Sequence, residues 1–286
     1  MLDELIRKTI REMVGGSGPP VAFLTPPGDR GLFGPESITW KVHADFISMM
    51  IGGISSLILQ ALHPQALAGV WDHSSFREDL KGRLGRTAFF IAATTYGSTE
   101  MADKVIAKVN QIHAKISGLD EFGKPYSATD PHLLAWVHLT ETYSFMQAFE
   151  DYRKEKLSLQ NKDQYFVEMK SLGERMGAHN LPSTFAKTDS AIKSYIPELH
   201  FGERAKSILD LLENFPSKLA AKPFIKLITR AGYLNLPDWV YPVINRPTPT
   251  LLERLAVKKS VDFIAVPIRE ALKDGVAAHS LRRVYG

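Results

Sequence analysis

The chain has 286 residues and a formal net charge of +4, with 44% hydrophobic and 23% charged residues. This composition is typical of a globular protein with a sizeable core, and its scattered basic residues do not indicate a nucleic-acid partner. Because the chain contains no cysteine, it can have no disulfide, thiolate-ligated heme or cysteine-ligated iron–sulfur cluster. We expect a cytoplasmic protein, with peripheral association with a membrane as the alternative.

The N-terminal part is predicted to be helical, with one connector rich in glycine and proline. An amphipathic helix over residues 1–14 precedes that connector, which covers residues 15–34. The next helix is expected to begin at Glu36 or Ser37 and to include the uncharged run 46–62, until His63-Pro64 breaks it. This run is at the lower limit of length for a membrane span, and its glycine, serine and glutamine residues favour a buried core helix. We therefore expect no stable membrane span.

Two adjacent glycines, Gly52 and Gly53, interrupt this apolar run. Each of them costs about 1 kcal/mol relative to alanine in a helix, so we expect another surface to lie directly against the backbone there. Close packing of a second helix is one interpretation. The face of a cofactor or of an apolar substrate is the other.

A short helical turn over 64–71 and a loop over 72–75 lead to an apolar helix over residues 83–96. This helix carries Arg83 and Thr87 one turn apart on the same face, with Arg86 beside them. A buried arginine on such a helix needs an anion or a carboxylate as its partner. An arginine at the surface or at the helix start is the simpler interpretation.

The following helix is predicted over residues 98–118, and a histidine lies in its apolar stripe. Ser98 or Thr99 can cap its start, and Gly118 can close its end. Because His113 belongs to the stripe, its imidazole must find a polar partner inside the protein. A hydrogen bond to a backbone carbonyl is one solution, and ligation of a metal or of a heme iron is the other. The stripe, with helical spacing, consists of Ala102, Val105, Ile106, Val109, Ile112, His113 and Ile116.

The rest of the chain is predicted to be helical as well. After a loop over 118–129, Asp130-Pro131 is a strong start for a helix that continues to about Lys154. No segment has the alternation of a strand, and no low-complexity linker separates a second domain. We predict an all-α fold in one domain over 1–286, with core motifs in 36–155 and a proline-punctuated part over 156–286. The C-terminal helices are expected over 160–177, 182–195, 203–213, 217–232, 237–244 and 249–274.

Five motifs occur in the order found in one protein family. They are G-G-I-S-S-L-I-L-Q-A-L-H-P at 52–64, D-H-S-S-F at 72–76, G-R-L-G-R-T at 82–87, V-N-Q-I-H-A-K-I-S-G at 109–118 and Y-S-A-T-D-P-H-L-L-A-W-V-H at 126–138. Over about residues 36–155 the chain thus resembles the MpaB/rubber oxygenase (latex clearing protein) catalytic-domain family. The resemblance implies a helical fold around a heme b with one proximal histidine. It also implies O2 chemistry at carbon–carbon double bonds of apolar isoprenoid chains.

Carried over motif by motif, the resemblance assigns the iron ligand to His113 and the catalytic distal side to Arg83 and Thr87. We expect Gly52, Gly53 and Arg86 to contact the cofactor. At the position of Arg86 some family members have a lysine that can approach the iron. A guanidinium group stays protonated and cannot act as a neutral ligand.

A second departure concerns an acidic residue that the rubber oxygenases carry upstream of the arginine. Residues 62–71 contain no Asp or Glu, which leaves Asp72, Glu78 or Asp79 for that role. We therefore expect a heme-dependent oxygenase that acts with O2 on a hydrophobic small molecule other than rubber. A non-enzymatic heme-binding or sensor protein and a heme-free helical lipid-binding module are the alternatives.

Overall fold

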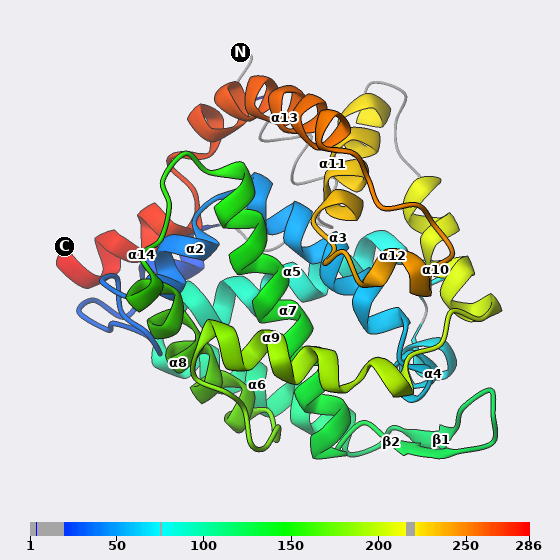
Figure 1. The fold of residues 1–286 in the computed structure, drawn as a ribbon. Coiled ribbons are helices and arrows are strands. Elements are labelled where there is room, and N and C mark those ends of the chain that lie inside the picture. The colour runs from blue at the N-terminus through cyan, green and yellow to red at the C-terminus, as the bar shows by residue number, and fades with distance from the viewer. Residues whose placement is uncertain (1–3, 5–19, 75, 216–220) are drawn as a thin grey trace.

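The computed structural model describes residue 4 and residues 20–74, 76–215 and 221–286. Almost all of the amphipathic helix predicted over 1–14 lies outside the described residues. The described part is helical apart from one two-stranded hairpin, so the predicted all-α class is confirmed (Figure 1). In chain order the elements are η1 (Pro20–Leu24), α2 (Ile38–His43), α3 (Phe46–Ala61), α4 (Pro64–His73), α5 (Leu80–Tyr96), α6 (Thr99–His113), β1 (Ser117–Leu119), β2 (Pro125–Ser127), α7 (Pro131–Tyr152), α8 (Leu159–Arg175), α9 (Phe185–Ser194), η2 (Ile196–Glu198), α10 (Glu203–Glu213), α11 (Lys222–Leu234), α12 (Val240–Val243), α13 (Leu251–Leu272) and α14 (Val276–Tyr285).

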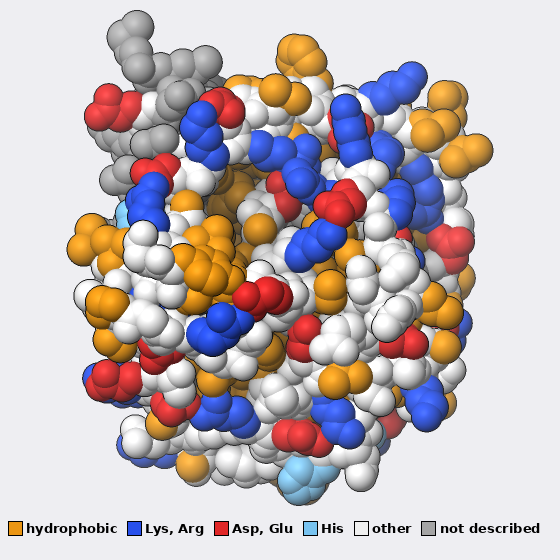
Figure 2. Space-filling view, turned by 90° about the vertical axis from the view of Figure 1, so that its left-hand side faces the viewer, with side chains coloured by type: hydrophobic (Ala, Val, Ile, Leu, Met, Phe, Trp, Pro, Cys, Tyr) orange, Lys and Arg blue, Asp and Glu red, His pale blue; other side chains and the backbone are white. Residues whose placement is uncertain are grey.

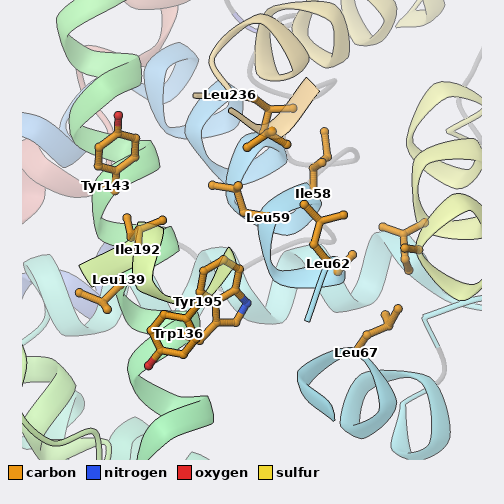
Figure 3. Packing of buried hydrophobic residues seen from close by; sticks show 14 of the residues in the cluster. Ile58, Leu59, Leu62, Leu67, Trp136, Leu139, Tyr143, Ile192, Tyr195 and Leu236 are labelled. Atoms are coloured by element: carbon orange, nitrogen blue, oxygen red, sulfur yellow. The ribbon is translucent and has the colours of Figure 1, made fainter. Parts of the chain in front are cut away.

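The centre of the molecule is the packing of α3 against α7 (Figure 1). α7 begins as predicted, because the Asp130 side chain accepts a hydrogen bond from the His132 amide and Pro131 occupies the first helical position. The largest apolar cluster surrounds this helix pair and also takes side chains from α4, α9, α10 and α12. Trp136 of α7 and Tyr195 lie side by side in it, below Leu59 and Leu62 of α3 (Figure 3).

The single helix predicted from about residue 36 to 62 is in fact two helices. Ser37 caps α2 by accepting from the Trp40 amide, in agreement with the expected start. The chain breaks at Asp45, whose carboxylate accepts from the Ser48 amide and so caps α3. The same carboxylate binds Arg269 of α13, with Oδ1 2.7 Å from Nε. Asp45 therefore both caps α3 and forms a long-range ion pair, and the apolar pattern carries no sign of that pair.

The helix predicted to continue to Gly118 ends earlier, at His113. Residues 117–119 instead form β1, which pairs antiparallel with β2 in the register Gly118↔Tyr126. A Cβ atom on Gly118 would lie 2.8 Å from the Tyr126 hydroxyl, so this glycine permits close packing of the hairpin rather than a helix end. The C-terminal helix α14 was not predicted. The start of the helix predicted over 217–232 lies outside the described residues, and α8, α9, α10, α12 and α13 match the predictions to within a few residues.

Arg283 of α14 fixes the turn between α5 and α6. Its side chain is buried and donates hydrogen bonds to the carbonyl oxygens of Phe23, Asp29, Tyr96 and Gly97, over 2.7 to 3.1 Å. Four carbonyl groups of irregular backbone are thereby satisfied by one guanidinium. Since α5 carries Arg83 and α6 carries His113, this C-terminal residue orients the two helices that are expected to form the site.

On the surface, acidic and basic side chains are interspersed among apolar patches on the face shown in Figure 2. Within the described residues, no single helix is long and apolar enough to cross a membrane. The consecutive helices α3 and α4 satisfy the length and composition criteria only when taken together, and they are bent by 104° at their junction.

The buried ion pair of Asp45 leads to a first prediction. Burial alone would raise the pKa of Asp45, but hydrogen bonds from Arg269 and Ser48 and the charges of Arg269 and Arg153 outweigh it and lower the pKa. Asp45→Asn preserves the cap, because asparagine is an equally good N-cap, and it removes the charge. We expect the free energy of unfolding at pH 7 to fall by about 3 kcal/mol, the lower end for breaking a buried pair, as measured by urea denaturation.

A lowered pKa means that Asp45 stabilises the native state above its unfolded pKa near 3.8, and that this contribution is lost as the pH falls through the folded value. The difference between Asp45→Asn and the native protein should therefore vanish in strong acid. Asp79 is the matched control, because it caps α5 in the same way but is exposed. An equal loss of stability in Asp79→Asn would contradict a special role for the buried pair.

Candidate functional site

Arg83 lies in the first turn of α5, which begins three residues earlier than predicted. Asp79 caps the helix by accepting from the Gly82 amide at 2.8 Å. The Arg83 guanidinium donates to Ser74 Oγ at 2.9 Å, and Ser74 in turn donates to the Val70 carbonyl. Among the residues that the structure describes, no carboxylate pairs with Arg83. Burial, with the charge of Arg86 nearby, lowers the pKa of Arg83.

Arg83 is the polar member of an otherwise apolar hollow. The hollow is lined by side chains from α3, α4, α5 and α10 and from the segment before α5. A fixed positive charge in such surroundings is costly unless an anionic or strongly polar group comes to it. The hollow thus combines an apolar wall with one cation that has only a serine hydroxyl as its partner. Its lining residues are Leu57, Val70, Phe76, Leu80, Arg83, Ile208, Leu211 and Leu212.

The other two predicted residues of α5 face outward. Thr87 and Arg86 are both exposed, and the Arg86 guanidinium lies 3.5 Å from the Asp79 carboxylate. Thr87 follows Arg83 by one turn on the same side of the helix, as predicted. Arg86 lies on a different side, so the structure groups it with the helix cap and not with the hollow.

His113 is the last residue of α6, and its environment differs from the fully buried stripe that was predicted. Ala102 and Ile106 are buried, His113 is partly buried, and Ile112 is 45% exposed. The Nδ1 atom of His113 is buried and has no hydrogen-bond partner, and within the described residues its Nε2 has none either. Burial lowers the pKa of His113, so the ring is neutral at pH 7. A neutral, unpartnered imidazole is the form that ligates a metal.

The end of α6 that carries His113 lies against the end of α8. Asn110 donates to the Arg175 carbonyl at 3.0 Å, and Arg175 pairs with Asp103. α8 also contacts α7 there, because a Cβ atom on Gly173 would lie 2.8 Å from the ring of His138. His113 and Arg83 thus lie at the ends of α6 and α5 that are remote from the Gly97-Ser98 turn. α5 and α6 themselves pack against each other.

Glu141 on α7 is a functional candidate that the sequence reasoning did not select. Burial raises its pKa to about 7, and among the described residues it has neither a hydrogen bond nor an ion pair. Among the described residues no hydrogen bond joins Glu141 to His138, one turn earlier on α7: His138 Nε2 lies 3.4 Å from Thr142 Oγ1 instead. Burial lowers the pKa of His138 to about 4, against a hydrogen bond with the Met169 backbone. The signal in the sequence was an acidic residue on the apolar face of α7.

Glu141 precedes Phe145 by one turn of α7, and Phe145 packs with residues of α2, α5 and α6. Its ring lies edge-on to His43, with 5.3 Å between ring centroids, and it shares a cluster with Phe90 of α5 and Ile106 of α6. His43 is itself neutral, because burial lowers its pKa to about 3. The face of α7 that bears Glu141 is therefore continuous with the packing of α5 on α6.

The acidic residues that were named as substitutes are all exposed. Asp72 accepts a hydrogen bond from the Tyr126 hydroxyl at 3.0 Å and lies 3.6 Å from Arg204. Asp79 caps α5 and pairs with Arg86. Asp72 and Asp79 are thus engaged by other groups, and neither pairs with Arg83.

The two glycines of α3 differ. A Cβ atom on Gly52 would lie 2.8 Å from the Ser144 carbonyl oxygen and 2.9 Å from the Phe145 Cα atom, so close packing of α3 on α7 accounts for this residue. A Cβ atom on Gly53 would meet only Phe145 Cε1, at 3.9 Å. Gly53 precedes Leu57 of the hollow by one turn, and its lack of a side chain has no packing explanation.

This difference predicts opposite results for two substitutions. Gly52→Ala forces a Cβ atom into the α7 backbone and should lower the free energy of unfolding by about 1–3 kcal/mol. Gly53→Ala meets no such obstacle and should raise it by up to about 1 kcal/mol, through the better helix propensity of alanine. Chemical denaturation of both variants checks this, and equal destabilisation would show that Gly53 is packed as tightly as Gly52.

Gly53→Leu then separates packing from cofactor contact. If a flat cofactor lies near Gly53, the leucine variant should retain less cofactor on purification, while the stability of its cofactor-free form stays near that of the native protein. A destabilised variant with unchanged cofactor content would remove Gly53 from the expected cofactor contacts.

A family model described as "ER-bound oxygenase mpaB/B'/Rubber oxygenase, catalytic domain" matches residues 40–265. The matched region runs from Trp40 in α2 to Ala265 in α13 and includes the hollow, His113 and Glu141. No curated protein and no solved structure matches the chain.

Proposed function

The chain belongs to the mpaB/rubber oxygenase catalytic-domain family, and from this we propose that it is a heme b-dependent oxygenase acting with O2 on a hydrophobic small molecule. The observation that carries the proposal is the imidazole of His113: neutral, partly buried and without a hydrogen-bond partner for its buried Nδ1. A neutral histidine is the heme ligand of globins and peroxidases, and the chain offers no cysteine as an alternative.

Three features of the described residues support heme binding. The ring nitrogens of His113 have no hydrogen-bond partner, a Cβ atom on Gly53 would meet only Phe145 Cε1 at 3.9 Å, and Arg83 is a half-buried cation with no carboxylate partner. When bound, the heme would supply the iron at which O2 is activated. His113 would hold the cofactor, and Arg83 with the apolar side chains around it would contact the substrate.

Two residues of the chain would then act on the reacting groups: one would stabilise negative charge, and the other would transfer a proton. Arg83 provides a fixed positive charge and N–H donors for negative charge that develops on an oxygen atom. Its apolar surroundings exclude water and strengthen that interaction. Glu141, with its pKa of about 7, exists in both protonation states near neutral pH, as a general acid or base must.

The test is the visible spectrum and its response to an anionic ligand. Protein expressed with adequate heme supply should show a Soret band, and Arg83→Ala should retain that band. The variant should bind cyanide at least about tenfold more weakly, because an opposite charge within about 4–6 Å shifts such equilibria by 1–3 pK units. Consumption of O2 with an unsaturated apolar substrate separates the oxygenase from a sensor.

Arg86→Ala is the matched control, since it removes the same charge from the same helix at an exposed position. It should leave cyanide affinity unchanged. Native cyanide affinity in Arg83→Ala would remove Arg83 from the distal side. The absence of any heme would leave a lipid-binding module as the function of this pocket.

A further inference from the structure

A second group of metal-binding side chains lies at the junction of three elements and shares no residue with the proposed heme site. His63 caps α4 directly after α3, His132 lies in the first turn of α7, and Glu198 ends η2. The Nε2 atom of His132 lies 2.9 Å from Glu198 Oε2, and that of His63 lies 3.3 Å from the same oxygen. One carboxylate oxygen is therefore shared by two imidazoles.

The spacing of these atoms is that of a small coordination sphere. One ligand atom from each residue lies within 4.8 Å of the other two. In a tetrahedral zinc site with bonds of about 2.0–2.1 Å, neighbouring ligand atoms are about 3.3 Å apart. Two imidazoles and one glutamate are also a ligand set that zinc uses in proteins, with the fourth position left to water.

Packing holds the two rings in place. His63 is buried beside Trp136 and Tyr195, with 6.1 and 6.2 Å between ring centroids. His132 stacks on Tyr195 at 4.5 Å, and the Tyr195 hydroxyl donates to the His132 carbonyl oxygen at 3.0 Å. Figure 3 shows Trp136 and Tyr195 forming one side-by-side aromatic pair. A ligand set held by packed neighbours loses little conformational freedom when a metal binds.

Access is suitable as well. The side chains of His132 and Glu198 are 51% and 40% exposed, so an ion can enter from solvent. The buried Nδ1 of His63 has no partner, so no other contact fixes its tautomer.

We propose that His63, His132 and Glu198 bind a divalent zinc-class metal ion that joins α7, η2 and the α3–α4 junction. The ion would replace hydrogen bonds in which a single carboxylate oxygen serves two rings. This site is independent of the heme, and it leaves one coordination position open to water.

The experiment is a titration of the full chain with Zn²⁺, after removal of any histidine tag and treatment with a chelator. Isothermal titration calorimetry and elemental analysis should give one Zn²⁺ per chain, in heme-free and heme-loaded protein alike. His132→Ala and Glu198→Gln should each weaken binding by more than roughly 100-fold, because loss of even an outer-shell partner costs 10–100-fold. Zn²⁺ should raise the melting temperature of the native protein and leave that of both variants unchanged.

His73→Ala is the matched control, as it removes an exposed histidine whose Nε2 lies 3.2 Å from the Ser117 carbonyl oxygen. It should bind Zn²⁺ as the native protein does. Both test variants alter partly exposed side chains, and circular dichroism confirms that they fold. The proposal is overturned if the native protein fails to bind one equivalent of Zn²⁺, or if the two variants bind it with native affinity. The cluster would then serve only as a hydrogen-bonded contact between the three elements. A missing Soret band would affect only the proposed heme function.

Discussion

His113→Ala should abolish the Soret band or weaken heme binding by at least about 100-fold. The reason is that the ligand role has no substitute nearby: the chain has no cysteine, and burial and hydrogen bonding keep His43 and His138 engaged elsewhere. The heme-free variant should be almost as stable as the native heme-free protein, because the His113 ring nitrogens have no partners to lose among the described residues. Heme titration followed by absorbance and urea denaturation of the heme-free forms measure the two effects.

The pair of measurements distinguishes a ligand from a structural residue. His73→Ala provides the control, since it removes an exposed histidine and should leave the spectrum intact. A native spectrum in His113→Ala would move the iron ligand to His138 or His63. A variant that unfolds without heme would instead assign His113 a packing role.

The helices could be predicted because local signals mark them. Asp130-Pro131 and Ser98 act as caps at the predicted places, and His63-Pro64 ends α3 as expected. Errors arose where distant residues decide the backbone. One predicted helix is divided at Asp45, which caps α3 and binds Arg269, more than 200 residues later. Gly118 pairs with Tyr126 across a hairpin of two three-residue strands, which is too short to show alternation.

In the candidate site, too, local patterns could be predicted from the sequence, whereas contacts between distant residues could not. Arg83 could be selected from its place on an apolar helix, and its surroundings are those of a buried cation. Thr87 shares that side of the helix, but its exposure could not be deduced from spacing. Glu141 lies on a helix that the sequence predicted, yet its lack of a partner depends on the distance to His138, which only the folded structure determines. The cluster of His63, His132 and Glu198 likewise combines residues from three separate elements.

Glu141→Gln should make the protein more stable at pH 8 by about 3 kcal/mol and leave its stability unchanged near pH 4. Burial raises the pKa of Glu141 from 4.5 to about 7, and each pK unit corresponds to about 1.4 kcal/mol. Because the folded value is the higher one, ionisation favours the unfolded chain. The cost begins above pH 4.5, increases up to about pH 7 and is constant beyond that value. Glutamine resembles the neutral acid in shape and does not pay this cost.

Urea denaturation at pH 4 and pH 8, with both proteins at the same heme content, measures the difference. Glu174→Gln, an exposed position on α8, should stay within about 0.5 kcal/mol of the native protein at both pH values. The same Glu141→Gln variant should lose turnover by about 10²–10⁴-fold, the usual contribution of a general acid or base. A stabilising substitution that removes activity is expected when a charge is retained for catalysis at the expense of stability. Loss of stability at both pH values would show instead that Glu141 makes a structural hydrogen bond, and its assignment as the proton-transferring residue would then be wrong.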